Sequence, residues 1–154
     1  MDFQTPKDVC NYMFQYVYEK DLRILEPTPG EGNLVSVLRQ NNNAVVAPNN
    51  FFDIDKTIER FDYVVMNPPF TPMKIGYQIL FDCMEMSDNI IALMPWLTII
   101  NAKGRTDKIL EYGLKSITHL PRTIFKGSRV QTCILEMRKG FVGDAMIKFY
   151  KEEK

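Results

Sequence analysis

The sequence predicts an α/β domain built on a doubly wound, mostly parallel sheet with helices on both faces, and three observations support this prediction. Short, wholly apolar runs, typical of buried parallel strands, alternate with segments whose apolar residues recur at helical spacing. Clusters of turn residues follow directly after the first and third of these runs. The last predicted strands are joined by short connections, so the C-terminal strands are expected to pair antiparallel.

The first predicted helix covers 6–19. Thr5 and Pro6 suit the N-cap and the first helical position. Apolar residues recur every fourth position from Val9 to Val17, so this stripe is expected to face the core. The next predicted elements are a buried strand at 22–25, a turn-rich loop at 26–33, a helix with Leu34, Val37 and Leu38 that ends at 41–43, and a strand at 44–47.

The second half of the chain continues this alternation. A buried strand at 61–66 ends abruptly at a turn with two prolines, Asn67-Pro68-Pro69-Phe70. The remaining predicted elements are a helix at 75–86, a buried strand at 89–94, a helical stretch at 105–112, strands at 116–120 and 130–138, and a last strand at 145–150. Ligands of such sheets bind at the carboxyl ends of the strands, where the glycine loop and the proline turn both lie.

Length and composition indicate one globular domain spanning 1–154. The chain is 45% hydrophobic and 12% aromatic, which excludes disordered, collagen-like and coiled-coil proteins and supplies a core without disulfides or a metal. The three cysteines, Cys10, Cys83 and Cys133, are odd in number and widely spaced, which fits neither a disulfide framework nor a zinc knuckle. Reduced, buried thiols are expected, and no metal site is expected.

No segment predicts membrane insertion or export. The longest apolar stretch, 89–100, is interrupted by Pro95 and is too short to span a bilayer. The acidic N-terminus, with Asp2, does not resemble a signal peptide. The sequence therefore predicts a soluble, cytoplasmic protein.

The net charge of zero conceals an uneven division of charge along the chain. Residues 1–102 carry 7 basic and 13 acidic side chains, whereas residues 103–154 carry 12 basic and 6 acidic ones. Scattered charges usually form a solvated surface, but this asymmetry also allows one side of a protein to face a polyanion. Both interpretations stay open at this point.

The glycine loop after the first strand is a candidate ligand site. Gly30-Glu31-Gly32 lacks the third glycine of a dinucleotide fingerprint, because Val35 occupies that position, and the chain has no G-K-S/T phosphate loop. A simple tight turn is one interpretation. However, Glu26 precedes the loop, and its carboxylate would repel a pyrophosphate but attract an ammonium or sulfonium group. The loop therefore favours a ligand of the S-adenosylmethionine type.

The proline turn after the third strand carries the most specific chemistry. Two prolines fix the backbone and remove two N–H donors, so the Asn67 side chain and the Pro68 carbonyl provide two adjacent acceptors. Two acceptors on a rigid turn suit an amino group with two hydrogens. Phe70 adds a flat apolar face on which a planar base can stack. The alternative is that this proline turn has only a structural role and ends the strand.

Taken in order, these motifs resemble the adenine-specific (N6) amino-methyltransferases of DNA that carry an NPPF turn. The motifs are Phe3-Gln4-Thr5-Pro6, the segment 25–33, Phe52-Asp53, Asn67-Pro68-Pro69-Phe70 and the closing segments 120–125 and 130–135. The resemblance covers nearly the whole chain. It implies a Rossmann-like methyltransferase catalytic domain, S-adenosyl-L-methionine as cofactor, and transfer of a methyl group to adenine in DNA by direct in-line attack, as in restriction-modification.

The resemblance also implies roles for matching positions. Glu26 would face the cofactor's ammonium group, Asp53 would accept from its adenine amino group, and Phe52 would lie against that ring. Asn67 and the Pro68 carbonyl would hold the substrate amino group, between the rings of Phe70 and Phe125. The implied catalytic positions are Asn67, Pro68, Pro69 and Phe70; the cofactor-binding positions are Phe3, Gln4, Thr5, Pro6, Glu26, Pro27, Gly30, Gly32, Asn33, Phe52, Asp53 and Asn67; the substrate-binding positions are Phe70, Phe125, Lys126 and Arg129.

The sequence departs from the family pattern at the second and third strands. An acidic residue usually ends the second strand and holds the ribose hydroxyls, but Asn49 and Asn50 follow this strand here. An amide binds a hydroxyl less strongly than a carboxylate does, so modest cofactor affinity is expected. About five residues separate the second strand from Phe52, too few for a parallel crossover, so the usual helix is expected to be missing and the third family strand vestigial.

The chain leaves no residues for a separate target-recognition domain. DNA contact is then expected from basic loops, and the candidates are Lys103, Arg105, Lys108, Arg122, Lys126 and Arg129. A few phosphate contacts give weak, largely nonspecific affinity for DNA. A homodimer or a separate specificity subunit is therefore an expected partner. No membrane association is expected.

Two other functions remain open. The same chemistry can act on an RNA base or a protein glutamine amide, although relatives with those acceptors more often end the turn in Tyr. A non-catalytic, cofactor-binding partner subunit of a methyltransferase is the other alternative, and the lost acid after the second strand favours it.

Overall fold

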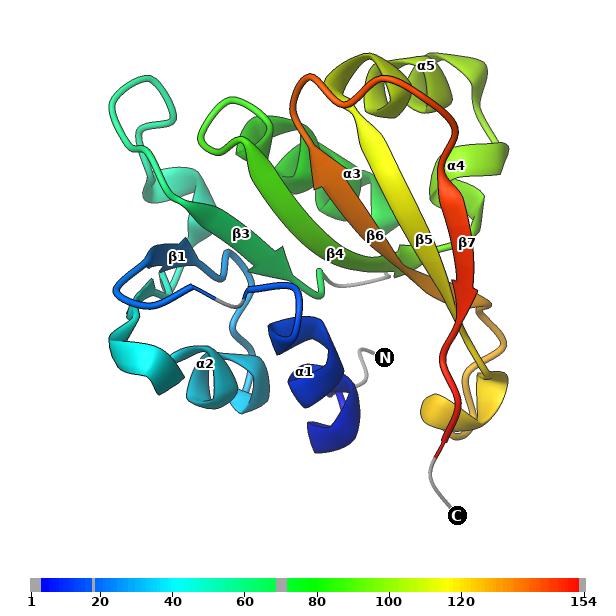
Figure 1. Ribbon diagram of the computed structural model, residues 1–154, viewed down its shortest axis with the longest axis horizontal. Helices are drawn as coiled ribbons and strands as arrows, with labels where there is room; N and C mark the ends of the chain where they lie inside the picture. The colour runs from blue at the N-terminus through cyan, green and yellow to red at the C-terminus, as the bar shows by residue number, and fades with distance from the viewer. Residues whose placement is uncertain (1–3, 18, 69–71, 153–154) are drawn as a thin grey trace.

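The computed structural model describes residues 4–17, 19–68 and 72–152, and its sheet has seven strands in the order β2-β1-β3-β4-β6-β5-β7 (Figure 1). Every strand predicted from the sequence is present. The strands are β1 (Arg23–Leu25), β2 (Ala44–Val46), β3 (Tyr63–Met66), β4 (Asn89–Pro95), β5 (Leu114–Leu120), β6 (Thr132–Arg138) and β7 (Met146–Phe149).

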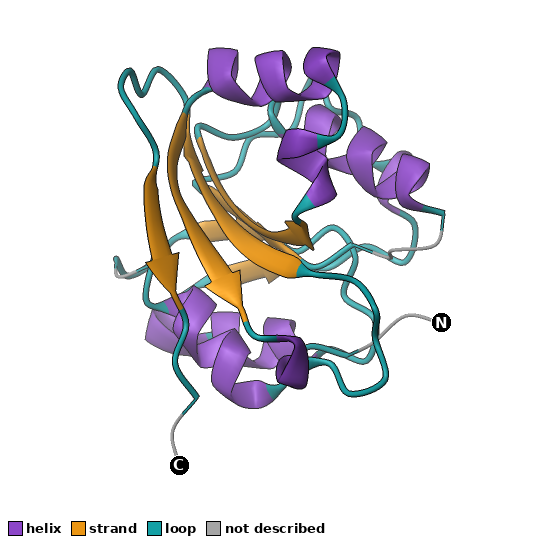
Figure 2. Cartoon of the chain, turned by 90° about the vertical axis from the view of Figure 1, so that its right-hand side faces the viewer, coloured by secondary structure: helices purple, strands orange, loops and turns teal. Residues whose placement is uncertain are grey.

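Helices cover both faces of this sheet, as predicted (Figure 2). Alternate residues of the buried strands show the division: Val64 and Met66 pack with residues of α3 and α5, whereas Val65 between them packs with residues of α1 and α2. The helices are α1 (Lys7–Phe14), α2 (Asn33–Leu38), α3 (Met73–Cys83), α4 (Leu97–Ile100) and α5 (Lys103–Tyr112), with 3-10 turns at Gln40–Asn42, Phe51–Asp53 and Arg122–Ile124.

The sheet is parallel from β2 to β4 and mixed beyond it. β1 pairs parallel with β2 and β3, and β3 pairs parallel with β4. β6 runs antiparallel to both of its neighbours, β4 and β5. The carboxyl ends of β1, β3, β4 and β5 therefore lie along one edge of the sheet.

The expected antiparallel pairing of the last strand is wrong. β7 runs opposite to β6, as the short connection requires, but it pairs with β5 in parallel, in a register that joins Ile117 to Ile147. The reason is that β4 and β5 already occupy both edges of β6, so the returning chain can pair only with the free edge of β5. The short connection determines the direction of β7 but does not determine which strand it pairs with.

The segments around α1 and β2 show which local predictions hold. The stripe from Val9 to Val17 is fully buried, as predicted, although α1 ends at Phe14 and the chain continues in tighter turns to Val17. Between β2 and β3 the described chain has one 3-10 helix and no α-helix, so the expected absence of the usual helix there is confirmed. All three cysteines are buried and free, also as predicted.

Across the described ranges, no helix combines the length and the apolar character that crossing a membrane requires.

Candidate active site

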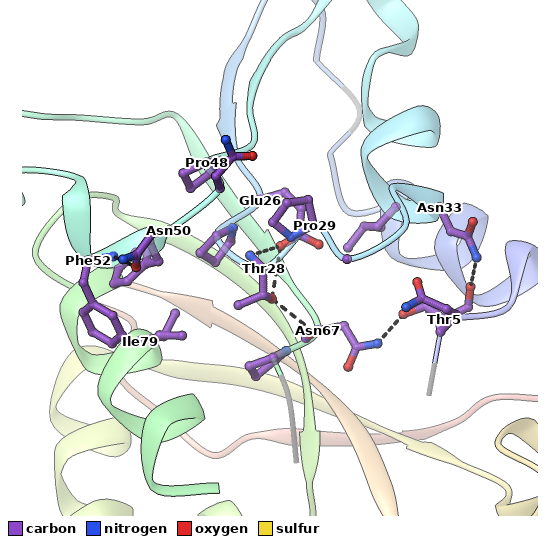
Figure 3. Close-up of a pocket in the computed structure, with 17 residues that line it drawn as sticks. Thr5, Glu26, Thr28, Pro29, Asn33, Pro48, Asn50, Phe52, Asn67 and Ile79 are labelled. Atoms are coloured by element: carbon purple, nitrogen blue, oxygen red, sulfur yellow. Dashed lines mark hydrogen bonds between the residues drawn. The ribbon is translucent and has the colours of Figure 1, made fainter. Parts of the chain in front are cut away.

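A cavity of about 500 Å³ opens at the edge of the sheet where β1 and β3 end (Figure 3). Four segments far apart in the sequence meet there: the N-terminal segment, the glycine loop, the stretch after β2 and the proline turn. Its walls are formed by residues 4–5, 26–30, 33–34, 48–52 and 67–68, together with Ile79 of α3. Parallel strands bring these segments together because their carboxyl ends share one edge.

Most of the predicted cofactor positions lie on this cavity. The predicted residues that line it are Gln4, Thr5, Glu26, Pro27, Gly30, Asn33, Phe52, Asn67 and Pro68. Pro6 and Gly32 do not line it, although each is directly next to a lining segment, and Asp53 is exposed in the 3-10 turn beyond Phe52. The predictions for Phe3, Pro69 and Phe70 fall outside the described residues.

Two glycines let the loop bend at the mouth of the cavity. Gly32 has φ of 89° and precedes α2 as its N-cap, a left-handed conformation that favours glycine. Gly30 has φ of 54°, and a Cβ atom there would lie 3.2 Å from Nε2 of Gln4. A side chain at position 30 would strain the backbone and would require the Gln4 side chain to shift by a few tenths of an ångström.

Glu26 is the acidic group of the cavity. The side chain follows β1, is 1% exposed, and its Oε1 accepts a hydrogen bond of 2.7 Å from the backbone N–H of Thr28. Burial raises the pKa of the Glu26 carboxyl to about 8, because the charged form loses its hydration. Among the residues described as lining the cavity, Glu26 is the one charged side chain, and none is basic. Such a site favours a cation and disfavours a phosphate.

Asn67 is held at both its side chain and its backbone. The Nδ2 group donates to the hydroxyl of Thr5, and the Asn67 carbonyl accepts a hydrogen bond of 3.1 Å from Oγ1 of Thr28. Figure 3 shows the amide nitrogen of Asn67 turned toward Thr5 and its oxygen turned away. With Nδ2 engaged, Asn67 presents an acceptor, which suits an amino group.

The segment after β2 provides a partly apolar wall with amide groups. Phe52 is 53% exposed and packs edge-to-face on Phe51, with ring centres 5.3 Å apart. Oδ1 of Asn50 accepts a hydrogen bond of 3.0 Å from the Phe52 N–H, so this oxygen caps the 3-10 turn. Asn49 is exposed beside it.

Comparison with known proteins supports the fold and gives no family assignment by sequence. No family profile and no curated protein matches the chain. Solved structures do match: the methyltransferase subunit of a type I restriction-modification system from Streptococcus thermophilus aligns with a TM-score of 0.76 and 15% identity, over 96% of this chain and 47% of that one.

Two further structures show the same arrangement. The M protein of the type I restriction enzyme EcoKI aligns with a TM-score of 0.72 and 12% identity, over 92% of this chain and 44% of that one. A Listeria monocytogenes protein assigned to the class I S-adenosylmethionine-dependent methyltransferases aligns with a TM-score of 0.70 and 14% identity, over 95% of this chain and 65% of that one.

The chain has the same Rossmann-like fold as these methyltransferases. It spans about half the length of the two restriction-modification subunits, at 47% and 44%. In this fold the cavity described above lies at the edge where ligands of open α/β sheets bind.

The predicted base-stacking residue Phe125 does not line the cavity of this methyltransferase fold. Its side chain is 5% exposed and packs in the core with residues of α1, β5 and β6. Lys126 and Arg129, predicted with it, are exposed. All three lie in the segment after β5, which starts at the same edge of the sheet as the cavity (Figure 1).

The other basic candidates are divided between two places. Arg105 lies over the ring of Tyr77 at 4.0 Å and Lys108 over the ring of Phe81 at 4.4 Å, so both fasten α5 to α3. Lys103 forms an ion pair with Asp107 on α5 itself. Arg122, in contrast, lies in the segment after β5 and donates to the carbonyl of Arg129. The six side chains therefore do not form one basic surface.

The contacts of Thr28 and the capping role of Asn50 were not predicted from the sequence. Thr28 bonds both to Glu26 and to Asn67 and so joins the two motifs. The bond from the Thr28 N–H to Glu26 spans two residues, but such turns are typical of Asn, Asp, Ser and Thr, so Glu-x-Thr gives little signal for it. The contact to Asn67 joins residues 39 positions apart, and no local pattern indicates it.

The raised pKa of Glu26 predicts a pH-dependent cost in stability. The unfolded carboxyl ionises near its ordinary pKa of 4.5, while the folded group binds its proton up to about pH 8. Ionisation of Glu26 therefore does not lower the free energy of unfolding below pH 4.5, and it lowers this free energy progressively as the pH rises from 4.5 to 8. We expect Glu26→Gln to raise the free energy of unfolding by about 2–4 kcal/mol at pH 8.5 and by little at pH 4.5.

Urea denaturation across this pH range measures the effect. Glu31→Gln, which removes an exposed carboxylate from the same loop, is the control and should leave the free energy of unfolding unchanged. A Glu26→Gln variant that is less stable than the wild type at pH 8.5 would contradict the prediction.

Proposed function

We propose that the chain is an S-adenosylmethionine-dependent methyltransferase that acts on the N6 amino group of adenine in DNA. The observation that carries the proposal is one cavity with two features: a buried carboxylate without a basic neighbour among the lining residues, and an asparagine amide oriented as an acceptor. The first suits a cationic cofactor and the second suits an amino group. A volume of about 500 Å³ lies within the range of small-molecule sites.

The residues of the cavity fit this cofactor. Glu26 would neutralise the ammonium group, which compensates the cost of burying the carboxylate. Phe52 and Ile79 supply apolar contacts for the adenine ring, and Asn49 supplies an amide for the ribose hydroxyls. S-adenosylmethionine, when bound, would supply the methyl group for direct in-line transfer: the sulfonium S–C bond would break as the N–C bond forms, the thioether would leave, and the nitrogen would lose one proton to water.

The proline turn would activate that nitrogen. The lone pair of an adenine amino group is delocalised into the ring, which makes the nitrogen a poor nucleophile. Asn67 Oδ1 and the Pro68 carbonyl would accept both amino hydrogens and draw the nitrogen toward a tetrahedral shape, which localises the lone pair. Positioning and electrostatics then do most of the catalysis. Phe70 remains the proposed stacking residue, and Phe125 is not included because its ring is buried.

DNA is proposed as the substrate because two of the aligned structures are subunits of restriction-modification enzymes. The base must leave the duplex to reach the cavity. Lys126 and Arg129 are exposed in the segment after β5, at the same edge as the cavity, and would contact phosphate. Two such contacts give weak affinity, so target selection is proposed to need a second copy of the chain or a specificity subunit.

Transfer of labelled methyl to unmethylated DNA, RNA and protein, assayed in parallel, tests the proposal. We expect label in DNA, recovered as N6-methyladenine after hydrolysis. Asn67→Ala should lower kcat by about 10²- to 10³-fold, because it removes an acceptor for the amino group. Label found only in RNA or only in protein would show that the substrate is not DNA. Binding of S-adenosylmethionine without any transfer would favour a non-catalytic partner subunit. Transfer by Asn67→Ala at the wild-type rate would refute the mechanism.

Calorimetry with S-adenosylmethionine tests the role of Glu26. Because the free carboxyl has a pKa of about 8, it is mostly protonated at pH 7, and a bound cation should release up to about one proton. Buffers of different ionisation enthalpy measure this release. Glu26→Gln should remove it and weaken affinity by about 10- to 100-fold, since a charge-assisted contact is lost. Equal affinity in the variant would contradict the assignment.

The two asparagines after β2 give a gain-of-affinity prediction. Asn49→Asp should tighten cofactor binding by about 3- to 10-fold, because a carboxylate accepts hydroxyl hydrogens more strongly than an amide does. Asn50→Asp is the matched control, since its oxygen already caps the Phe52 N–H, and should change affinity less than about 2-fold. An equal gain in both variants would show general attraction of a cation and contradict a specific ribose contact.

A further inference from the structure

We infer that Thr5 and Thr28 are positioning residues that together fix Asn67 for the acceptor amino group. The inference rests on the proposed function and adds two residues to the machinery of the acceptor site. Each threonine holds a different end of Asn67, and each comes from a segment that also lines the cofactor cavity.

Thr5 holds the side-chain amide. It is 3% exposed, and its hydroxyl accepts from Nδ2 of Asn67. The Thr5 carbonyl is itself anchored, because it accepts from Nδ2 of Asn33 at 3.3 Å and from Sγ of Cys10 at 3.6 Å. Thr5 is therefore a fixed point between the starts of α1 and α2, and the amide of Asn67 is bound to that point.

Thr28 holds the backbone of the turn. Its hydroxyl has one proton, and Oγ1 lies 3.1 Å from the Asn67 carbonyl and 3.4 Å from Oε1 of Glu26. The shorter distance assigns the proton to the carbonyl of Asn67. The backbone N–H of Thr28 donates to Oε1 of Glu26 at 2.7 Å, and this bond does not depend on the orientation of the hydroxyl. Thr28 thus serves both motifs with two separate donors.

The need for these two bonds follows from the prolines. Residues 68 and 69 have no N–H, so the turn lacks the donors that usually tie a strand end to its neighbours. Asn67 must then be placed through its own carbonyl and amide. If the amide rotated by half a turn, it would offer N–H groups to an amino group that is also a donor. The bond from Nδ2 of Asn67 to the Thr5 hydroxyl corresponds to the productive orientation, and the bond from Thr28 fixes the backbone from which this amide extends.

Valine substitutions remove each hydroxyl at nearly constant shape. We expect Thr5→Val and Thr28→Val to lower kcat by about 10- to 100-fold at saturating cofactor and DNA, because small misplacements of a catalytic group have effects of this size. The dissociation constant of Thr28→Val for S-adenosylmethionine should change less than about 3-fold, since this variant keeps the N–H that binds Glu26. Thr5→Ser and Thr28→Ser restore the hydroxyl and should recover kcat to within about 3-fold.

A second measurement needs no activity. In the 1H–15N spectrum of the free chain, the two Nδ2 protons of Asn67 should give a well-separated pair of peaks, identified by its loss in Asn67→Asp. Thr5→Val should move this pair toward the positions of exposed asparagines. Thr106→Val is the matched control, because its half-buried hydroxyl also bonds to backbone carbonyls but lies in α5, and it should change neither the pair nor kcat.

The two measurements separate the failure of this inference from the failure of the proposed function. If the wild type neither binds S-adenosylmethionine nor transfers methyl, the proposed function fails, and the Asn67 peaks still decide whether Thr5 fixes the amide. Unchanged kcat together with unmoved peaks in the valine variants would overturn the positioning role. So would a parallel loss of kcat, cofactor affinity and melting temperature, which indicates a purely structural effect.

Discussion

Glu26 carries an acidic group into the interior at the end of β1, where burial holds it protonated up to about pH 8. β1 lies between β2 and β3, so the residue after it is covered on both sides by the segments that follow those strands. Burial of an unneutralised carboxylate opposes folding, and such groups are typical of functional sites. The glycine loop, the amide-rich stretch after β2 and the proline turn all surround this group, and a bound cation would remove its cost.

The sequence was sufficient for the sheet because buried parallel strands are continuous apolar runs that need no knowledge of their neighbours. Which strands pair with each other was harder to predict from the sequence. The short connection before β7 determined its direction, but its partner depended on both edges of β6 being taken. α4 was missed for a different reason, since Pro95 and Trp96 interrupt the apolar stretch in which it lies and four residues give little periodicity.

The site divides in the same way. Glu26, Gly30 and Asn67 were predictable because each lies at a strand end in a motif only a few residues long, and the structure gathers them on one cavity. Phe125 looked equivalent in sequence, yet its ring fills the core, because an aromatic residue after a strand is compatible with either position. Thr28 showed the reverse: its motif was noticed, but its contact with Asn67 depends on how two strands align.

The uneven charge of the chain has two physical uses, and separating them sharpens the expected DNA contact. Arg105 and Lys108 lie over aromatic rings of α3, so part of the basic third stabilises packing. Lys126 and Arg129 remain exposed at the end of β5, and β5 runs in the same direction as β4, so these two side chains are at the edge that carries the cavity. A polyanion attracted there would meet the acceptor turn, whereas a cation would be drawn to Glu26. Under the proposed function, the basic pair would attract DNA phosphate, and the Glu26 carboxyl, ionised when a cation binds, would hold the cofactor at the same edge of the sheet.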